Sequence, residues 1–223
     1  MILGLDISTS CTGYAIVDSN GTPIFVGSID LTKLDNVFEK ANSVLATVVD
    51  IIHSNKIDIT NIFVEESLQA FRPGMSSANT ICSLAKMNGL VSYLFANYYQ
   101  LPVVPIASQT ARKSCGIKII KGINTKKQVL DHLILNQLQN WEIPQKKKKN
   151  ECVNQVLDAA DALVIALAGH NMIRNKQGVI LNTNGNNDNI TTNSILAKDI
   201  LLCNIVKIWK GSSRKVSIRI LSN

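Results

Sequence analysis

The segment VNQVLDAADALVIALAGH, residues 153–170, limits most strongly what this chain can fold into. Its apolar composition is typical of a buried helix, yet it contains Asp158 and Asp161. The i, i+3 spacing places both carboxylates on neighbouring parts of one helical surface, and Asp161 shares the stripe of Leu157 and Val164 that is expected to pack. An ionised carboxylate buried without a partner is very costly. The two aspartates must therefore be paired with cations or bind metal.

Further carboxylates interrupt two apolar segments that are expected to be strands. Asp6 lies in MILGLDIS, and Glu65 and Glu66 lie in NIFVEES. Side chains alternate along a strand, so only one of the two glutamates can readily join Asp6 on a given side of a sheet. A single aspartate on an apolar helix is more often a cap or a solvent-facing residue than a ligand. Four such acids without a histidine or cysteine cluster favour a hard cation such as Mg²⁺ or Mn²⁺, which indicates phosphoryl chemistry.

The order of the expected elements indicates an α/β protein. Two early strands are joined by Asn-Gly, which supplies the positive φ angles of a tight hairpin turn, and helices and strands then alternate. The expected strands are 1–8, 13–18, 23–30, 61–67 and 102–107, and the expected helices are 33–55, 76–99, 124–138 and the aspartate helix. This pattern predicts a compact three-layer arrangement around a sheet of mixed direction.

Composition indicates which class of partner and which cellular compartment to expect. The formal net charge of +7 favours an acidic partner such as nucleic acid or an anionic membrane surface. Five scattered cysteines without a CxxC pair argue against a disulfide framework and a zinc site. We find no basic signal region and no stretch of about 18 uncharged apolar residues. We therefore expect an intracellular, cytoplasmic protein without a membrane partner.

Five blocks of the sequence are similar, in order and spacing, to RuvC-type Holliday-junction resolvases of the RNase H-like superfamily, with the texture of phage or viral members. The blocks are ILGLDISTSCTGYAIVD, FVEES, PVVPIASQTARKSCGIK, TKKQVLDHL and DAADALVIALAGH, within residues 1–172. The resemblance implies an RNase H-like three-layer α/β fold with a mixed five-stranded sheet flanked by helices. For a viral protein it implies the host-cell cytoplasm.

The resemblance also implies a set of catalytic residues. The four acidic positions of the family fall on Asp6, Glu65, Asp158 and Asp161, which would be catalytic and would hold two Mg²⁺ ions, with Mn²⁺ able to substitute. Glu65 is preferred because it follows Phe-Val, as the family glutamate follows two apolar strand residues, and Glu66 is the alternative. The implied activity is metal-dependent, structure-selective cleavage of four-way DNA junctions by paired nicks, carried out by a homodimer.

Basic and aromatic residues around these blocks are candidates for contacts with DNA. The family places cations that contact phosphates near Arg112, Lys113, Lys126 and Lys127, and Lys126 matches its position best. Phe71 is a candidate wedge for an opened junction, although a core phenylalanine is the simpler interpretation. The four lysines at 146–149 fit either phosphate contact or a solvated loop.

Two other interpretations stay open, and a third is disfavoured. The chain could be an RNase H-like nuclease for flaps, forks or other branched DNA, or a catalytically idle module that binds branched DNA. An actin-like sugar kinase rests only on GLDISTS, and the chain is short for the two lobes of such an enzyme.

The expected domain organisation has three parts. Residues 1–174 form the nuclease domain, residues 175–194 an Asn-rich linker, and residues 195–223 a basic C-terminal extension of unknown role. The helix at 76–99 has more apolar residues than a single stripe requires, which makes it the expected dimer surface.

Overall fold

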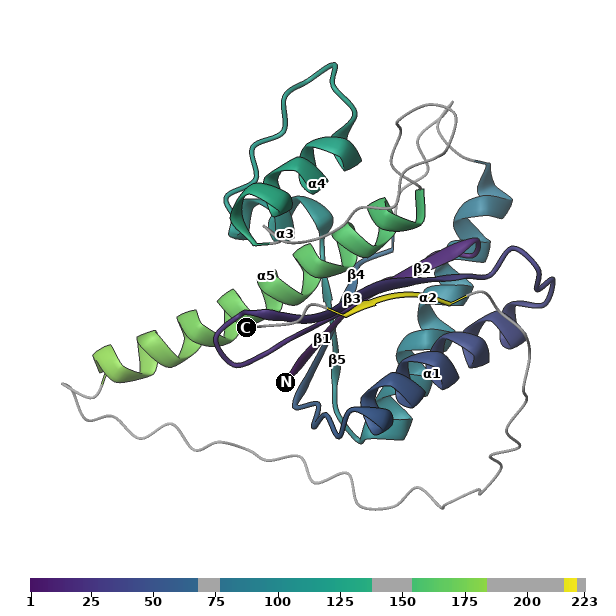
Figure 1. Cartoon of the computed structure of the whole chain (residues 1–223), viewed down its shortest axis with the longest axis horizontal. Coiled ribbons are helices and arrows are strands. Elements are labelled where there is room, and N and C mark those ends of the chain that lie inside the picture. Colours follow the sequence, from purple (N-terminus) through teal and green to yellow (C-terminus); the bar gives the residue numbers. More distant parts are fainter. Residues whose placement is uncertain (68–76, 138–153, 184–214, 220–223) are drawn as a thin grey trace.

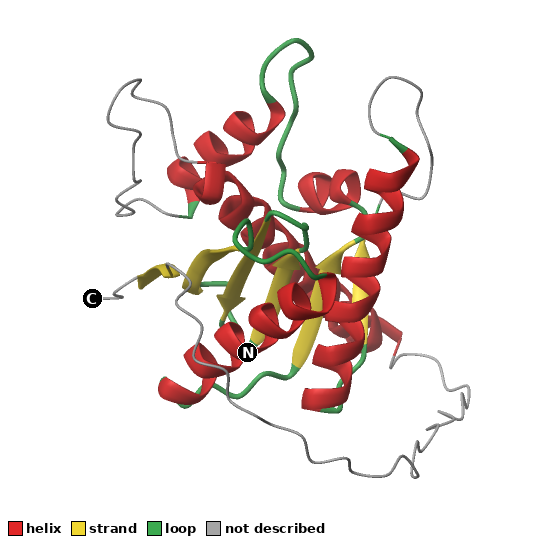
Figure 2. Ribbon diagram, turned by 90° about the vertical axis from the view of Figure 1, so that its right-hand side faces the viewer, coloured by secondary structure: helices red, strands yellow, loops and turns green. Residues whose placement is uncertain are grey.

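The computed structural model describes residues 1–67, 77–137, 154–183 and 215–219, which form a sheet with helices on both faces (Figures 1 and 2). Phe71 and residues 146–149 lie outside the described residues, as does most of the expected linker and C-terminal extension. The strands are β1 (Ile2–Asp6), β2 (Cys11–Val17), β3 (Pro23–Asp30), β4 (Asn61–Glu65), β5 (Val103–Ile106) and β6 (Lys215–Arg219). The helices are α1 (Val37–Ser54), α2 (Ala78–Tyr99), α3 (Ser108–Ser114), α4 (Thr125–Asn136) and α5 (Asn154–Thr183).

The sheet has the strand order β5-β4-β1-β2-β3-β6. Strands β1, β2 and β3 form an antiparallel meander, whereas β4 and β5 run parallel to β1. The β2–β3 turn is the Asn-Gly hairpin expected from the sequence, with Gly21 at φ 82° and Asp18 Oδ1 accepting from the backbone N–H of Asn20 and of Thr22, both at 2.8 Å. The mixed five-stranded α/β sheet flanked by helices is confirmed. β6, from the C-terminal extension, adds a sixth strand antiparallel to β3.

The two faces of the sheet carry separate hydrophobic cores. Helices α1 and α2 cover one face, where they pack on Leu3, Leu5 and Ile16. Helix α5, with α3 and α4 beside it, covers the other face and packs on Ile2 and Phe63 (Figure 1). Alternation along β1 therefore directs its even-numbered residues toward α5, and Asp6 continues that series at the end of the strand.

Helix α5 lies unusually close to β1 and β2 because glycine occupies the contact points. A Cβ on Gly4 would lie 2.5 Å from the backbone nitrogen of Ala166 and 2.7 Å from the carbonyl oxygen of Ala162. A Cβ on Gly13 would overlap the carbonyl oxygen of Asp158. These contacts fix the height of α5 above the sheet at the level of its two aspartates.

Residues 155–175 of α5 are long and apolar enough to cross a membrane, and their mean hydropathy is 1.4. However, 67% of this window is buried inside the protein, and α5 packs along β1, β2 and β3. The window is the central core helix of the fold.

Three features differ from the pattern that the sequence suggests. Helix α3 was not expected, because its seven residues are mostly polar and too few to show helical periodicity. Helix α5 continues to Thr183, into the segment expected to be a linker. Most of the apolar residues of α2 that exceed a single stripe pack within the chain: Met87, Val91 and Phe95 are fully buried, and Leu90 and Leu94 pack against the same core.

Candidate active site

Three elements bring the four predicted carboxylates to one end of the sheet. Asp6 is the last residue of β1, and Glu65 is the last residue of β4. The two strands are parallel, with Leu5 aligned on Val64, so both strands end in a carboxylate at the same edge of the sheet. Asp158 and Asp161 reach this edge from the first turns of α5. The acids that were far apart in the sequence therefore share one site.

The register of β4 separates the two glutamates. Ile62 and Val64 belong to the α1–α2 core, whereas Phe63 packs against α5. Glu65 follows Phe63 by two residues and so lies on the α5 side, where its charge acts on Asp6 and Asp161. Glu66 is exposed beyond the strand end. The structure thus places Glu65 with the other acids and directs Glu66 away from them.

Two cations, one from α3 and one from α4, contact the α5 aspartates. The Lys126 ammonium lies 2.5 Å from Asp158 Oδ1 and 3.4 Å from Asp161 Oδ2. Arg112 Nη2 lies 3.7 Å from Asp161 Oδ1. The Asp161 side chain is only 6% exposed, and these cations satisfy the requirement that a buried aspartate be paired. Lys126 is held there because it opens α4, whose cap is Asn124 accepting from the Lys127 backbone N–H.

The electrostatics of the site are those of crowded carboxylates. Burial raises the pKa of Asp6 well above its usual range, and the charges of Glu65, Asp161 and Asp158 raise it further against the opposing effect of Lys126. Burial also raises the pKa of Asp161, with Lys126 and Arg112 acting in the opposite direction. Burial alone would lower the pKa of Lys126, but its hydrogen bond to Asp158 and the surrounding acids raise it overall. The site therefore favours additional positive charge.

Cys11 was not singled out from the sequence and lies at this site. It is buried at the start of β2, and burial together with the neighbouring Asp158 raises its pKa to about 12. The thiol is accordingly neutral. Cys11 and Gly13 are two residues apart on β2 and so share one face of the sheet. Gly13 lies against Asp158, so this spacing is the sequence signal that could have placed Cys11 at the site.

The donor set can be compared with the needs of a metal ion. In the part of the chain that the structure describes, no group of three His, Cys, Asp or Glu side chains is arranged closely enough to hold a metal in this conformation. The Lys126 ammonium instead lies between Asp158 and Asp161. The donors are all carboxylate oxygens, which suit hard divalent cations, and the neighbouring carboxylates together with burial raise the pKa of Asp6. The residues present fit such ions.

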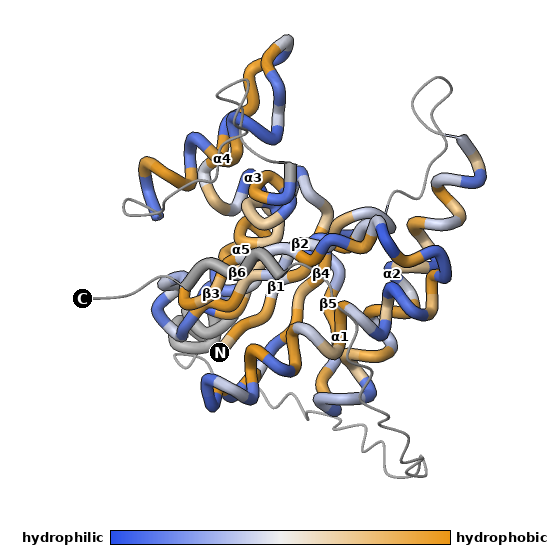
Figure 3. Tube along the Cα trace, turned by 45° about the vertical axis from the view of Figure 1, so that its right-hand side comes forward, coloured by the Kyte–Doolittle hydropathy of each residue, from blue (hydrophilic) through white to orange (hydrophobic). Residues whose placement is uncertain are grey.

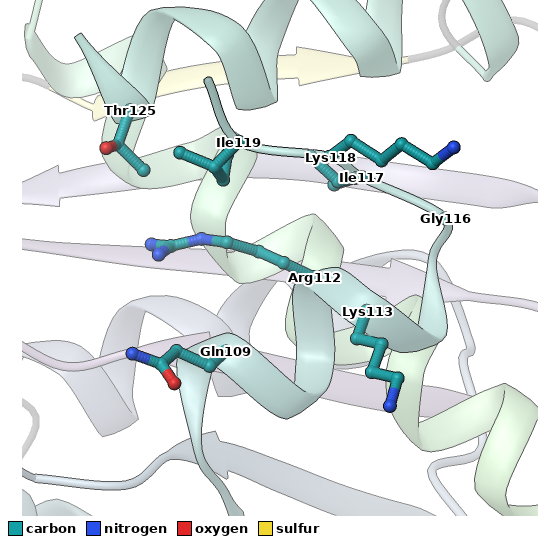
Figure 4. A pocket seen from close by; sticks show the side chains of 8 residues that line it. All are labelled: Gln109, Arg112, Lys113, Gly116, Ile117, Lys118, Ile119 and Thr125. Carbon is teal, nitrogen blue, oxygen red and sulfur yellow. The ribbon is translucent and has the colours of Figure 1, made fainter. Parts of the chain in front are cut away.

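The other described cations predicted to contact DNA lie on α3 and at the start of α4. Arg112 and Lys113 line a pocket of about 500 Å³ between α3 and the start of α4, and Figure 4 shows the side chains of Lys113 and Lys118 extending away from that of Arg112. Lys127 is exposed on the first turn of α4. The pocket is lined by Gln109, Arg112, Lys113, Gly116, Ile117, Lys118, Ile119 and Thr125.

Two histidines take structural positions away from the carboxylates. His170 contacts the carbonyl oxygen of Ser19 at 3.0 Å, in the β2–β3 turn, and His53 contacts the Tyr98 hydroxyl at 3.1 Å. Neither residue contacts the four carboxylates.

Comparisons with known proteins agree with this architecture. Residues 1–168 match the DUF3882 family, described as Lactococcus phage M3 protein. No curated protein sequence matches the chain. Among solved structures, Thermus thermophilus RuvC in complex with a Holliday junction substrate is similar with a TM-score of 0.54 and 17% identity, covering 78% of this chain and 94% of that one. A second Thermus thermophilus RuvC structure has a TM-score of 0.52 and 19% identity, covering 78% and 96%. The chain therefore has the RuvC fold, as its sequence blocks implied.

Proposed function

Since the chain belongs to the DUF3882 family, described as Lactococcus phage M3 protein, and has the RuvC fold, we propose that it is a metal-dependent endonuclease that resolves four-way DNA junctions by paired nicks. The observation that carries this proposal is the convergence of Asp6, Glu65, Asp158 and Asp161 at one sheet edge, with Lys126 and Arg112 against them. Branched DNA is also the substrate bound in the similar Thermus thermophilus RuvC structure.

The four carboxylates would hold two Mg²⁺ ions, which Mn²⁺ could replace. When bound, such ions activate water and stabilise the leaving oxygen of a phosphodiester. Burial raises the pKa of Asp6 and of Asp161, so metal binding to these two carboxylates should release protons and weaken at low pH. In the absence of metal, Lys126 and Arg112 balance the charges of the two α5 aspartates.

The cations around the site suit a phosphate backbone. Lys113, Lys118 and Lys127 are exposed, and the first two line the same pocket as Arg112. Each phosphate contact releases counterions and adds salt-dependent affinity. The acidic cluster alone would repel DNA. The positive charges of these lysines would offset that repulsion and attract the scissile phosphate.

The proposal includes a homodimer, because a junction is resolved by cuts on two opposing strands and each chain supplies one site. Sedimentation equilibrium at micromolar concentration measures this directly. We expect twice the chain mass of 24.4 kDa. A monomer that cuts flaps as readily as junctions would favour the alternative of a nuclease for other branched DNA.

The central experiment measures cleavage of a four-way junction, a flap, a fork and a linear duplex in Mg²⁺, Mn²⁺ and EDTA. We expect the junction to be cut first, on two strands and only with a metal ion. A junction extruded in a supercoiled cruciform then shows whether both nicks occur within one binding event.

Glu65→Gln and Glu66→Gln form a matched pair for this assay, because the residues are adjacent and differ in the face they occupy. We expect Glu65→Gln to reduce cleavage by orders of magnitude and to leave junction binding intact, since it removes a ligand and a negative charge near phosphate. Glu66→Gln should cleave like the wild type. The reverse result would move the site to Glu66, and two active variants would contradict a carboxylate-based mechanism.

A further inference from the structure

The loop between α3 and α4 presents apolar side chains to solvent. It projects from the body of the protein at the top of Figures 1 and 2, and Figure 3 shows hydrophobic and hydrophilic residues alternating along it. Ile119, Ile120 and Ile123 are 40%, 62% and 52% exposed. Exposing three isoleucines on one short loop is costly in water, and none of the three belongs to the hydrophobic core, which Ile117 and Cys115 of the same loop do contact.

This loop is held in a defined shape by Gln128 of α4. The Gln128 side chain accepts from the Ile120 backbone N–H at 2.8 Å and donates to the carbonyl oxygens of Ile120 and Ile123, both at 3.1 Å. Two glycines with positive φ, Gly116 at 72° and Gly122 at 91°, allow its turns. The exposed isoleucines are therefore presented on a braced support.

Charge and position indicate what the loop contacts. Lys118 and Lys121 alternate with the isoleucines and are exposed, and no acidic residue occurs between Ala107 and Asp131. The loop leads directly into Lys126, which contacts Asp158. The exposed isoleucines have only cations as charged neighbours in the sequence, and the helix that follows them carries Lys126 of the carboxylate cluster. This combination complements a partner that is polyanionic outside and apolar between its stacked bases.

We propose that Ile120, with Ile123 beside it, is a wedge that inserts between base pairs at the branch point while Lys118 and Lys121 contact the flanking phosphates. The inference rests on the proposed function and adds the element that would open the DNA. Apolar side chains such as isoleucine serve as wedges between base steps, where unstacking costs a few kcal/mol per step and is least costly where pairing is already interrupted. The wedge therefore favours branched DNA over duplex.

The test uses the full chain in EDTA, where metal-dependent cleavage stops, and four-way junctions with 2-aminopurine at single positions around the branch point. Unstacking raises the fluorescence of this base, and titration gives the affinity. Ile120→Ser combined with Ile123→Ser is compared with Phe38→Ser, which removes an apolar side chain of equal exposure (61%) from α1 on the other side of the sheet. All these side chains are exposed, so unchanged circular dichroism is expected and checks folding.

We expect the wild type and Phe38→Ser to raise the fluorescence at a position next to the branch point. The double variant should lose that rise and bind junctions about tenfold more weakly, the size expected when the burial of about one aliphatic side chain is lost, with duplex affinity kept because the lysines remain. Equal fluorescence and affinity for the wild type and the double variant would overturn the wedge, as would equal losses on junction and duplex.

Two further outcomes separate this inference from the proposed function. If the wild type binds and cuts junctions without any rise in fluorescence, the wedge is wrong and the nuclease stands. If the wild type binds no branched DNA, both are wrong. The same variants are tested with phosphatidylserine vesicles, and loss of vesicle binding with unchanged junction binding would assign the loop to a membrane surface and overturn the wedge.

Discussion

Asp6→Asn should abolish cleavage and yet stabilise the protein when no divalent ion is bound. In the folded chain the Asp6 carboxyl is buried beside Glu65, Asp161 and Asp158, and its pKa is raised well above the usual range. No ion pair to Asp6 is found among the described residues. Asparagine has nearly the same shape and removes the charge that burial and repulsion oppose.

The magnitude follows from linkage. Each unit by which a folded pKa exceeds the unfolded value costs about 1.4 kcal/mol of stability at a pH above both. Relief of about 2 kcal/mol is a moderate expectation for a buried charge with partial compensation from Lys126. For a chain of this length such a change raises Tm by about 4 to 8 °C.

The stability difference between Asp6→Asn and the wild type should grow with pH. At a pH well below about 4, the carboxyl is protonated in both folded and unfolded chains, so the variant and the wild type should be equally stable. As the pH rises, the carboxyl ionises first in the unfolded chain. The free energy of unfolding of the wild type therefore decreases relative to that of the variant until the pH passes the raised folded pKa. Differential scanning fluorimetry in EDTA from pH 4 to 8 measures this difference.

Two controls sharpen the measurement. Asp161→Asn removes a carboxylate that is paired with Lys126 and Arg112, so the loss of those pairs offsets the relief and little stabilisation is expected. Asp131→Asn, on an exposed position of α4, should have no effect. Mg²⁺ should then raise Tm of the wild type and not of Asp6→Asn. A destabilised Asp6→Asn in EDTA, or an advantage that shrinks with rising pH, would refute the crowded-carboxylate description.

Three other expectations test parts of the site. Gly13→Ala should lower stability by about 1 to 3 kcal/mol in urea denaturation, because its Cβ overlaps the Asp158 carbonyl, and an unaffected midpoint would show that α5 can move away. Lys126→Met should lower Tm in EDTA by leaving Asp158 unpaired, and Mg²⁺ should restore much of the loss, whereas a loss that Mg²⁺ cannot restore would indicate a packing defect. Removing Lys118 and Lys121 should reduce the slope of log affinity against log salt by roughly two, and an unchanged slope would exclude phosphate contacts.

Local chemistry made most of the fold predictable. The Asn-Gly turn, the alternation of β1 and the apolar run of α5 each have one physical reading, and all three are found. The choice of Glu65 rested on the two apolar residues before it, and the register of β4 places that residue on the α5 side with Asp6. Its catalytic role remains a prediction until the glutamate pair is measured.

The features that sequence reasoning missed depend on tertiary contacts. Polar helix α3 has no periodicity to reveal it, and its position follows from Ala111, which is fully buried in the α5-side core. Much of the apolar excess of α2 packs within the chain, on the α1–α2 side of the sheet, and the dimer surface expected on this helix stays a prediction. Lys126 and Arg112 were expected to contact phosphates, and only the folded chain shows them on the aspartates.

The glycine contacts under α5 imply that the two layers of this protein face different evolutionary constraints. On the α5 side, backbone touches backbone at Gly4 and Gly13, so the spacing of the clustered carboxylates is a property of the main chain and leaves no room for a larger residue. On the α1–α2 side, side chains such as Leu3, Met87 and Phe95 fill the space between helix and sheet and can be exchanged for others of similar volume. Sequence drift and laboratory redesign should accordingly be tolerated in one layer and selected against in the other.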